Sequence, residues 1–183
     1  MRKKREFIEG AAYHVTSRTN DKKRVFECNV GKKTLLLVLR DAKEKFGFKV
    51  MNFCIMPTHI HLLIIPGEKG NLSQIMHWVK THSSKRWNGI HGSTGHLWGN
   101  RFFARKIHDL RDYLFVMDYI DKNPVKAGLT SSAGGWEASG AYHIEENIPG
   151  LVDYDDFTRR LYARQKLLAG PKAPVASGGG HEN

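Results

Sequence analysis

The stretch MPTHIHLLII, residues 56–65, decides the fold of this 183-residue chain. Alternate side chains of a β-strand point to the same face, so one face would carry His59 and His61 and the other Ile60, Leu62 and Ile64. The proline-threonine pair ahead of the histidines predicts a tight break between this strand and an earlier one. One strand face therefore contributes to a core, and the other presents two imidazoles able to bind a metal ion.

The segments around this stretch predict an α+β fold. Strands are expected over residues 11–19, 48–56, 59–65 and 101–108. One helix should begin at Asn29 and stop at Gly47, and another should begin at Asn71 or Ser73 and end near residues 87–89. The order βαββαβ is that of the ferredoxin-like fold, an antiparallel four-stranded sheet with both helices on one face. The other face is left free for the two histidines.

A third helix should start at Asp109 or Asp112 and end at Pro124, because proline disfavours helical geometry in the residue before it. On this helix Tyr119 and Asn123 are four residues apart and share a face, which we expect to lie across the open face of the sheet. Two histidines, a tyrosine and an amide oxygen suit metal-assisted nucleophilic attack on a phosphodiester.

The rest of the chain predicts less. We expect residues 130–150 to be rich in loops, followed by a C-terminal amphipathic helix over 153–168, one domain over 1–170 and a disordered tail over 171–183.

The histidine strand, followed by Tyr119-x3-Asn123-Pro-Val-Lys-Ala-Gly, resembles the single-tyrosine HUH transposases, in particular the branch called REP-associated tyrosine transposases. Tyr-His-Val-Thr-Ser-Arg at 13–18, Leu-Trp-Gly-Asn-Arg-Phe-Phe at 97–103 and Trp-Glu-Ala-Ser at 136–139 are similar to other parts of that family. The resemblance covers roughly residues 5–143.

The resemblance implies an enzyme that cuts and rejoins single-stranded DNA at hairpin sequences through a 5′-phosphotyrosine intermediate. Tyr119 would be the nucleophile, and one Mg²⁺ or Mn²⁺ would be held by His59, His61 and Asn123. Related enzymes often carry glutamine in the place of Asn123, so the shorter side chain could reach the metal through a water. The family includes monomers and homodimers.

The charge distribution independently favours DNA binding. The net charge is +11 and the pI about 9.7, and residues 69–108 contain no Asp or Glu. Within that stretch basic residues alternate with tryptophan and phenylalanine, as a surface for phosphates and unpaired bases requires. We therefore expect single-stranded and hairpin DNA to be bound by Arg2, Lys3, Lys4, Arg5, Arg18, Lys80, Lys85, Arg86, Arg101, Arg105 and Lys106.

Other interpretations stay open at this stage. Tyr113 is the rival nucleophile, although six helical residues, roughly 600°, turn it to a different direction from Tyr119. His14 is expected to be a strand residue without a catalytic role, and four more histidines are expected to contact phosphate or lie on the surface: His77, His82, His96 and His108. The alternative functions are a non-catalytic hairpin-DNA-binding protein, a zinc hydrolase, and a replication initiator or relaxase.

The cellular compartment is inferred from the cysteine pattern and the apolar runs of the sequence. Cys28 and Cys54 form no closely spaced pair and are expected to be small buried side chains in a reducing environment. The basic first residues are not followed by an apolar stretch, and no apolar run approaches the roughly 20 residues that cross a bilayer. We expect a cytoplasmic protein with no membrane partner.

Overall fold

The computed structural model describes residues 7–8, 10–153, 156–160 and 162, and the chain divides into two compact units, residues 1–153 and 154–183. In the second unit, residues 156–160 and 162 are helical, as predicted for that segment. The remainder of the predicted C-terminal helix, the predicted boundary at residue 170, the tail and the N-terminal arm of residues 2–5 lie outside the described residues. The first unit carries the candidate site.

The sheet of the first unit has the predicted ferredoxin-like topology. It contains β1 (Tyr13–Arg18), β2 (Lys49–Met56), β3 (His59–Ile65) and β4 (Phe103–Lys106), in the order β2-β3-β1-β4 with every neighbouring pair antiparallel. The histidine strand β3 is therefore an inner strand, paired on both sides. Its apolar residues Ile60, Leu62 and Ile64 are fully buried, as their alternation predicts.

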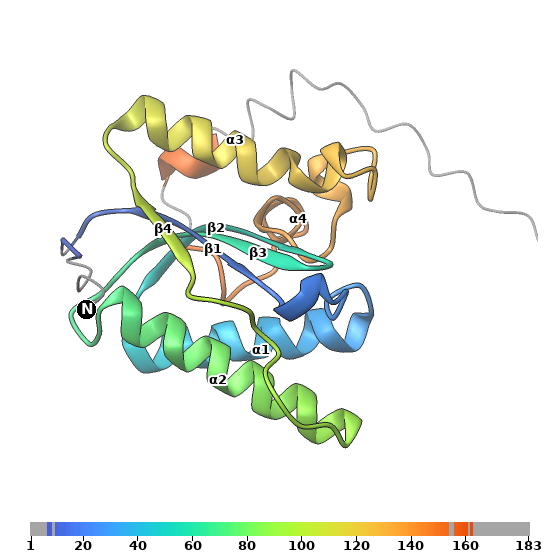
Figure 1. The fold of residues 1–183 in the computed structure, drawn as a ribbon. Helices are drawn as coiled ribbons and strands as arrows, with labels where there is room; N and C mark the ends of the chain where they lie inside the picture. Colours follow the sequence, from blue (N-terminus) through green and yellow to red (C-terminus); the bar gives the residue numbers. More distant parts are fainter. Residues whose placement is uncertain (1–6, 9, 154–155, 161, 163–183) are drawn as a thin grey trace, which may run out of the picture. The chain divides into compact units, whose positions relative to one another are not determined.

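Helices cover both faces of this sheet, as Figure 1 shows. On one face lie α1 (Asn29–Phe46) and α2 (Leu72–His91), and on the other lie α3 (Leu110–Lys126) and the short α4 (Gly140–Glu145). Two 3₁₀ turns, Asn20–Lys22 and Ala133–Gly135, complete the elements that the structure names. Gly47 in the left-handed conformation ends α1, and a reciprocal pair of hydrogen bonds between Asn71 and Gln74 begins α2.

The third helix departs from the sequence prediction at its C-terminus. It does not end at Pro124 but continues to Lys126, with the Ala127 N–H bonded to the Asn123 carbonyl. A proline in the last turn removes a single helical hydrogen bond, which a helix tolerates better there than in its interior. Its start at Asp109, whose side chain accepts from the Asp112 N–H, agrees with the prediction.

The expectation that Cys28 is buried was wrong. Cys28 is exposed, and its sulfur accepts the Gly31 N–H and caps α1, which begins at Asn29 as predicted. The second helix runs past residues 87–89 to His91, where Gly92 caps it. Residues 130–150 contain α4, which begins at Ser139 because the serine oxygen accepts the Tyr142 N–H.

A buried polar contact fixes α3 on the sheet. The Asn52 amide of β2 donates to the Asp121 carboxylate at 2.8 Å, and both side chains are buried. The Asn52 amide oxygen meanwhile accepts the Phe53 N–H at 2.7 Å. A Cβ at Gly140 would overlap that oxygen, so only glycine lets α4 approach here. These contacts hold the helix that carries Tyr119 across the sheet face opposite α1 and α2.

Among the helices that the structure describes, none is long and apolar enough to span a membrane.

Candidate DNA-processing site

Three adjacent strands present polar side chains to the face beneath α3. In the registers of the sheet, Thr16 of β1 lies between His61 of β3 and Phe103 of β4, while Arg18 lies opposite His59 and His14 opposite Arg105. Because side chains alternate along each strand, these residues share one face. Together with residues of α3 they line a pocket of about 350 Å³, here called the active-site pocket: His14, Thr16, Arg18, His59, His61, Phe103, Arg105, Phe115, Val116 and Tyr119.

The structure brings Tyr119 to the two histidines, as the sequence predicted. Its ring centroid lies 5.5 Å from that of His61, nearly perpendicular to it, and the His59 and His61 rings are 5.0 Å apart. The Lys126 ammonium lies 5.6 Å from the centre of the tyrosine ring. Tyr113, the rival nucleophile, is not among the residues that line this pocket.

The imidazoles of this pocket are held in their neutral form. Burial, together with the neighbouring His59, His14 and Arg18, lowers the pKa of His61 to about 3. Burial and the Arg105 charge lower the pKa of His14 to about 4, and burial with Arg18 lowers the pKa of His59. A neutral imidazole has a free lone pair, which is the form that binds a metal ion.

Hydrogen bonds at Nδ1 leave the other ring nitrogen of each β3 histidine for a ligand. The His59 Nδ1 lies 3.0 Å from the Thr58 hydroxyl, and the His61 Nδ1 lies 3.1 Å from the His14 Nε2. The His61 Nε2 is buried and has no hydrogen-bond partner in the described part of the chain. A buried polar atom without a partner is rare and calls for an explanation. Two neutral imidazoles, one with such a nitrogen, fit a divalent ion, although no three His, Cys, Asp or Glu side chains within the described ranges are grouped to hold one.

Asn123 is not brought to the histidines in this arrangement. It is four residues beyond Tyr119 on α3, and its side-chain nitrogen donates to the Tyr119 carbonyl at 2.7 Å. It does not line the active-site pocket. To contribute its oxygen to a metal at His59 and His61, the Asn123 side chain would have to turn away from the Tyr119 carbonyl and break this hydrogen bond. Its role as third ligand therefore stays a prediction.

Sequence reasoning missed several residues of the pocket. His14 was expected to have no role there, yet it contacts both His61 and Tyr119. The alternation of His14, Thr16 and Arg18 along β1 could have shown that they share a face, but not that this face adjoins His61. Phe115 was not singled out, and it is 67% exposed at the rim of the pocket, four residues from Tyr119. Phe103 is 58% exposed beside it, whereas Phe102 is buried.

Two larger hollows follow one another from the active-site pocket. The first, of about 800 Å³, shares Thr16, Arg18 and Phe103 with it and extends past the turn at residues 20–22. The second, of about 540 Å³, shares His96, Trp98, Gly99 and Arg101 with the first and runs along α2. We call the three hollows together the basic groove.

The predicted DNA-binding residues divide according to this groove. Arg18, Arg101 and Lys85 line it, and within the described residues none of the three forms an ion pair. Lys80 lines it too, but its half-buried ammonium donates to the carbonyls of Gly99 and Asn100, and burial lowers its pKa.

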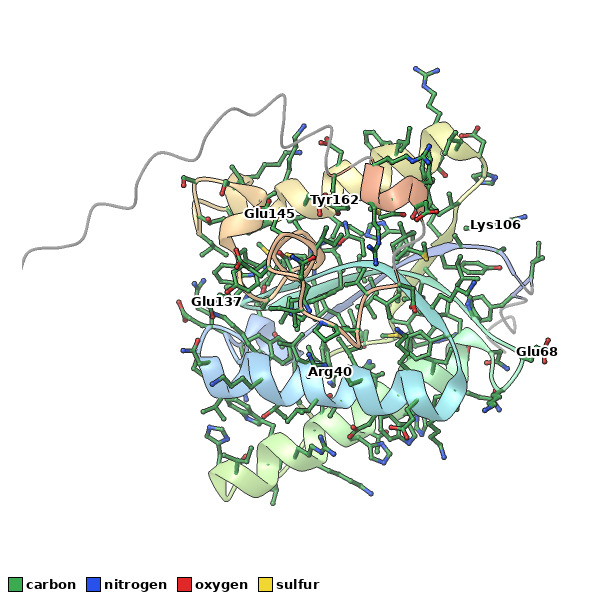
Figure 2. The ribbon with its side chains drawn as sticks, turned by 180° about the vertical axis from the view of Figure 1, so that it is seen from behind. Arg40, Glu68, Lys106, Glu137, Glu145 and Tyr162 are labelled. Atoms are coloured by element: carbon green, nitrogen blue, oxygen red, sulfur yellow. The ribbon has the colours of Figure 1, made fainter. Side chains whose placement is uncertain are left out.

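The remaining predicted DNA contacts are less available. The two terminal guanidinium nitrogens of Arg105 donate to the Asp112 carboxylate at 2.8 Å, so its charge is paired although it lines the pocket. Arg86 forms an ion pair with Asp41 of α1. Lys106, next to Arg105 on the edge strand β4, lines none of the three hollows, and Figure 2 shows it on the other side of the view from Glu137.

Comparison with known proteins identifies the class of protein that carries this site. The family model of IS200-like transposases matches residues 8–123, from just before β1 to Asn123 of α3. The chain belongs to the IS200-like transposase family.

Two similar proteins point to the same branch that the sequence predicted. A protein of Haemophilus influenzae, named by inference as a REP-associated tyrosine transposase, is 25% identical over 146 residues, covering 74% of this chain and 82% of its own length. A solved structure of a REP-associated tyrosine transposase bound to a REP hairpin is similar with a TM-score of 0.67 and 21% identity, covering 85% of this chain and 92% of that one. The resemblance and the α+β fold predicted from the sequence are both confirmed.

Proposed function

We propose that this transposase cuts and rejoins single-stranded DNA beside hairpin sequences through a 5′-phosphotyrosine intermediate on Tyr119, with one Mg²⁺ or Mn²⁺ ion. The observation that carries the proposal is the placement of Tyr119 against two neutral histidines, one with an unpartnered buried nitrogen. His59 and His61 would hold the ion through Nε2. When bound, such an ion would withdraw electron density from a phosphate oxygen and so favour attack on phosphorus.

Tyr119 carries out the cleavage and rejoining steps. The Tyr119 oxygen attacks the phosphorus and gives up its proton, the bond from phosphorus to the 3′ oxygen breaks, and that oxygen takes up one proton and leaves as a 3′ hydroxyl. The new bond joins the tyrosine oxygen to the 5′ phosphate. In the reverse direction a 3′ hydroxyl attacks the phosphotyrosine and releases Tyr119, which rejoins the DNA without another energy source. Lys126 and Arg18 supply positive charge near the phosphate.

The basic groove supports DNA as the substrate. It leads from the active-site pocket around the ends of β1 and β4 to α2 and is lined by Arg18, Arg101 and Lys85. Exposed Phe103 and Phe115 offer flat rings at the pocket, where unpaired bases could stack. The solved relative binds a REP hairpin, and we assign a hairpin of the same kind, with an unpaired flank, to this chain.

The function is tested with a fluorescent hairpin oligonucleotide that has an unpaired 5′ flank. Incubation with the full chain and Mn²⁺ should give a covalent protein–DNA band on a denaturing gel, and chelation of the ion with EDTA should abolish it. Tight hairpin binding without any adduct would identify the alternative, a hairpin-binding protein that does not cut.

The groove is tested by the matched pair Arg101→Gln and Arg24→Gln. Arg24 is exposed, paired with Glu27 and outside the groove. Loss of one phosphate contact should lower the slope of log affinity against log salt by about 0.7 to 1. We expect that change for Arg101→Gln and none for Arg24→Gln in fluorescence anisotropy titrations at several salt concentrations. Equal slopes for all three proteins would remove Arg101 from the DNA path.

A further inference from the structure

The His14 ring contacts both His61 of the histidine strand and Tyr119. Its Nε2 is 3.1 Å from the His61 Nδ1, and the two rings stack with centroids 5.3 Å apart and planes 18° apart. Its other contact is with Tyr119, whose ring stands nearly perpendicular at 5.8 Å. His14 is 9% exposed, so this arrangement is fixed by packing and not by a chance surface contact.

The short distance between the two nitrogens requires one of them to carry the proton. If the proton is on His14, the His61 Nε2 must carry the other ring hydrogen of His61, and a buried N–H would be left unpaired. If the proton is on the His61 Nδ1, the His14 Nε2 accepts it and the His61 Nε2 presents a bare lone pair. Only the second arrangement lets His61 bind a metal ion.

The neighbouring histidine shows the same pattern with a different partner. The His59 Nδ1 is 3.0 Å from the Thr58 hydroxyl oxygen, which can accept an N–H. Both histidines of β3 thus have Nδ1 occupied and Nε2 left over, although one partner, Thr58, lies in the turn before β3 and the other, His14, lies on β1. Metal-binding histidines are usually oriented in this manner by an acceptor on the other nitrogen.

We propose that His14 is a positioning residue: it accepts the Nδ1 proton of His61, fixes the tautomer whose Nε2 faces a divalent ion, and packs the same ring against Tyr119. The inference rests on the proposed metal site but assigns a role to a residue outside the ligand set. His14 is not itself a ligand in this account, because its Nε2 is already bonded to His61.

The first test reads the tautomer of His61 without any DNA or metal. Two-bond ¹H–¹⁵N correlation spectra of the full chain distinguish a ring protonated at Nδ1 from one protonated at Nε2. We expect the Nδ1–H tautomer for His61 in the wild-type protein and the Nε2–H tautomer for His14→Phe. A wild-type His61 protonated at Nε2 would overturn the inference, and this measurement needs no variant that could fail to fold.

The second test measures Mn²⁺ affinity by isothermal titration calorimetry for wild type, His14→Phe and His14→Gln. Phenylalanine keeps a flat ring but cannot accept a proton, whereas the glutamine amide oxygen reaches about as far as Nε2 and can. Loss of such an orienting acceptor lowers metal affinity by about 10- to 100-fold. We expect a loss in that range for His14→Phe and restoration to within about threefold for His14→Gln, with His143→Leu as the buried-histidine control.

The outcomes separate this inference from the proposed function. Equal Mn²⁺ affinity of wild type and His14→Phe would overturn the role of His14 while leaving the covalent adduct on Tyr119 in place. A wild-type protein that binds no Mn²⁺ would overturn both the metal site and the inference. A protein that binds Mn²⁺ with the expected ranking but forms no adduct would support His14 and contradict the cleavage proposal.

Discussion

Two regions of the first unit bury a histidine, and they differ in what surrounds it. Under α3, His61 lies among His14, His59 and Tyr119 in the active-site pocket. On α4, His143 packs its ring edge against Phe53 and faces a pocket of about 450 Å³ lined also by Lys32, Lys33 and Arg40 of α1. Figure 2 shows Arg40 on the α1 side of that region.

Burial alone does not distinguish the two regions. The pKa of His61 is lowered to about 3 and that of His143 to about 4, in both cases mainly by burial. Each has a buried ring nitrogen without a partner in the part of the chain that the structure describes. The difference lies in the groups around His61: the imidazole of His59 two residues away, the His14 ring hydrogen-bonded to its Nδ1, and the Tyr119 ring. A perturbed histidine becomes a candidate site through such an arrangement, and not through its pKa alone.

The largest difference should appear in cleavage. We expect His61→Ala to lower adduct formation below detection while hairpin affinity stays within about threefold, because affinity comes mainly from phosphate contacts elsewhere. His143→Leu should cleave at the wild-type rate. Gel assays with Mn²⁺ and anisotropy titrations measure the two quantities. Cleavage that survives in His61→Ala would place the chemistry outside the β3 histidines.

Exposed side chains at the two pockets should also differ in their contribution to hairpin affinity. Phe115 is exposed at the active-site pocket, and Leu37 is 51% exposed at the pocket beside α4. A base stacked on an aromatic ring contributes about 1 to 3 kcal/mol, so Phe115→Ala should weaken binding of a hairpin with an unpaired flank by about tenfold or more. Leu37→Ala should not change that affinity, and neither should change binding of blunt duplex. Equal losses on both substrates would exclude stacking by Phe115.

A third difference concerns acid stability at His143, where the change affects stability and not DNA. Its folded pKa lies below its unfolded value of 6.5, so the unfolded chain takes up a proton first and stability falls as the pH drops from 6.5 towards 4. At pH 5 this amounts to about 2 kcal/mol. Urea unfolding at pH 7.5 and pH 5 measures this effect. Between the two pH values, the free energy of unfolding of His143→Leu should fall by about 2 kcal/mol less than that of the wild type. The same loss in both proteins would contradict a neutral buried His143.

The histidine strand, the helix that carries Tyr119 and the order of the sheet could be predicted from the sequence because they depend on local periodicity. The alternation of residues 59–65 predicted both the core face and the histidine face, and the four-residue spacing of Tyr119 and Asn123 predicted their shared helix face. The order of elements then predicted the sheet and the position of α3. Each of these steps uses a rule that acts within one element or between sequence neighbours.

The parts that were missed depend on pairing between distant residues. The role of His14 requires the register that sets β1 beside β3, which no local pattern reveals. The short α4 is stabilised by its approach to Asn52 and not by a long amphipathic repeat. Arg105 and Arg86 were counted as free cations because their partners Asp112 and Asp41 are brought to them only by the fold. Net charge in a sequence stretch therefore overestimates the charge available to DNA.

We expect Tyr119, and no other tyrosine, to become covalently linked to DNA. The pair of variants Tyr119→Phe and Tyr113→Phe tests this assignment. Both tyrosines lie on α3, but only Tyr119 lines the active-site pocket. With a labelled hairpin and Mn²⁺, we expect no covalent band from Tyr119→Phe and an unchanged band from Tyr113→Phe, with both variants binding the hairpin as wild type does. Peptide mass spectrometry of the wild-type adduct should place the nucleotide on Tyr119. An adduct that persists in Tyr119→Phe would contradict the account.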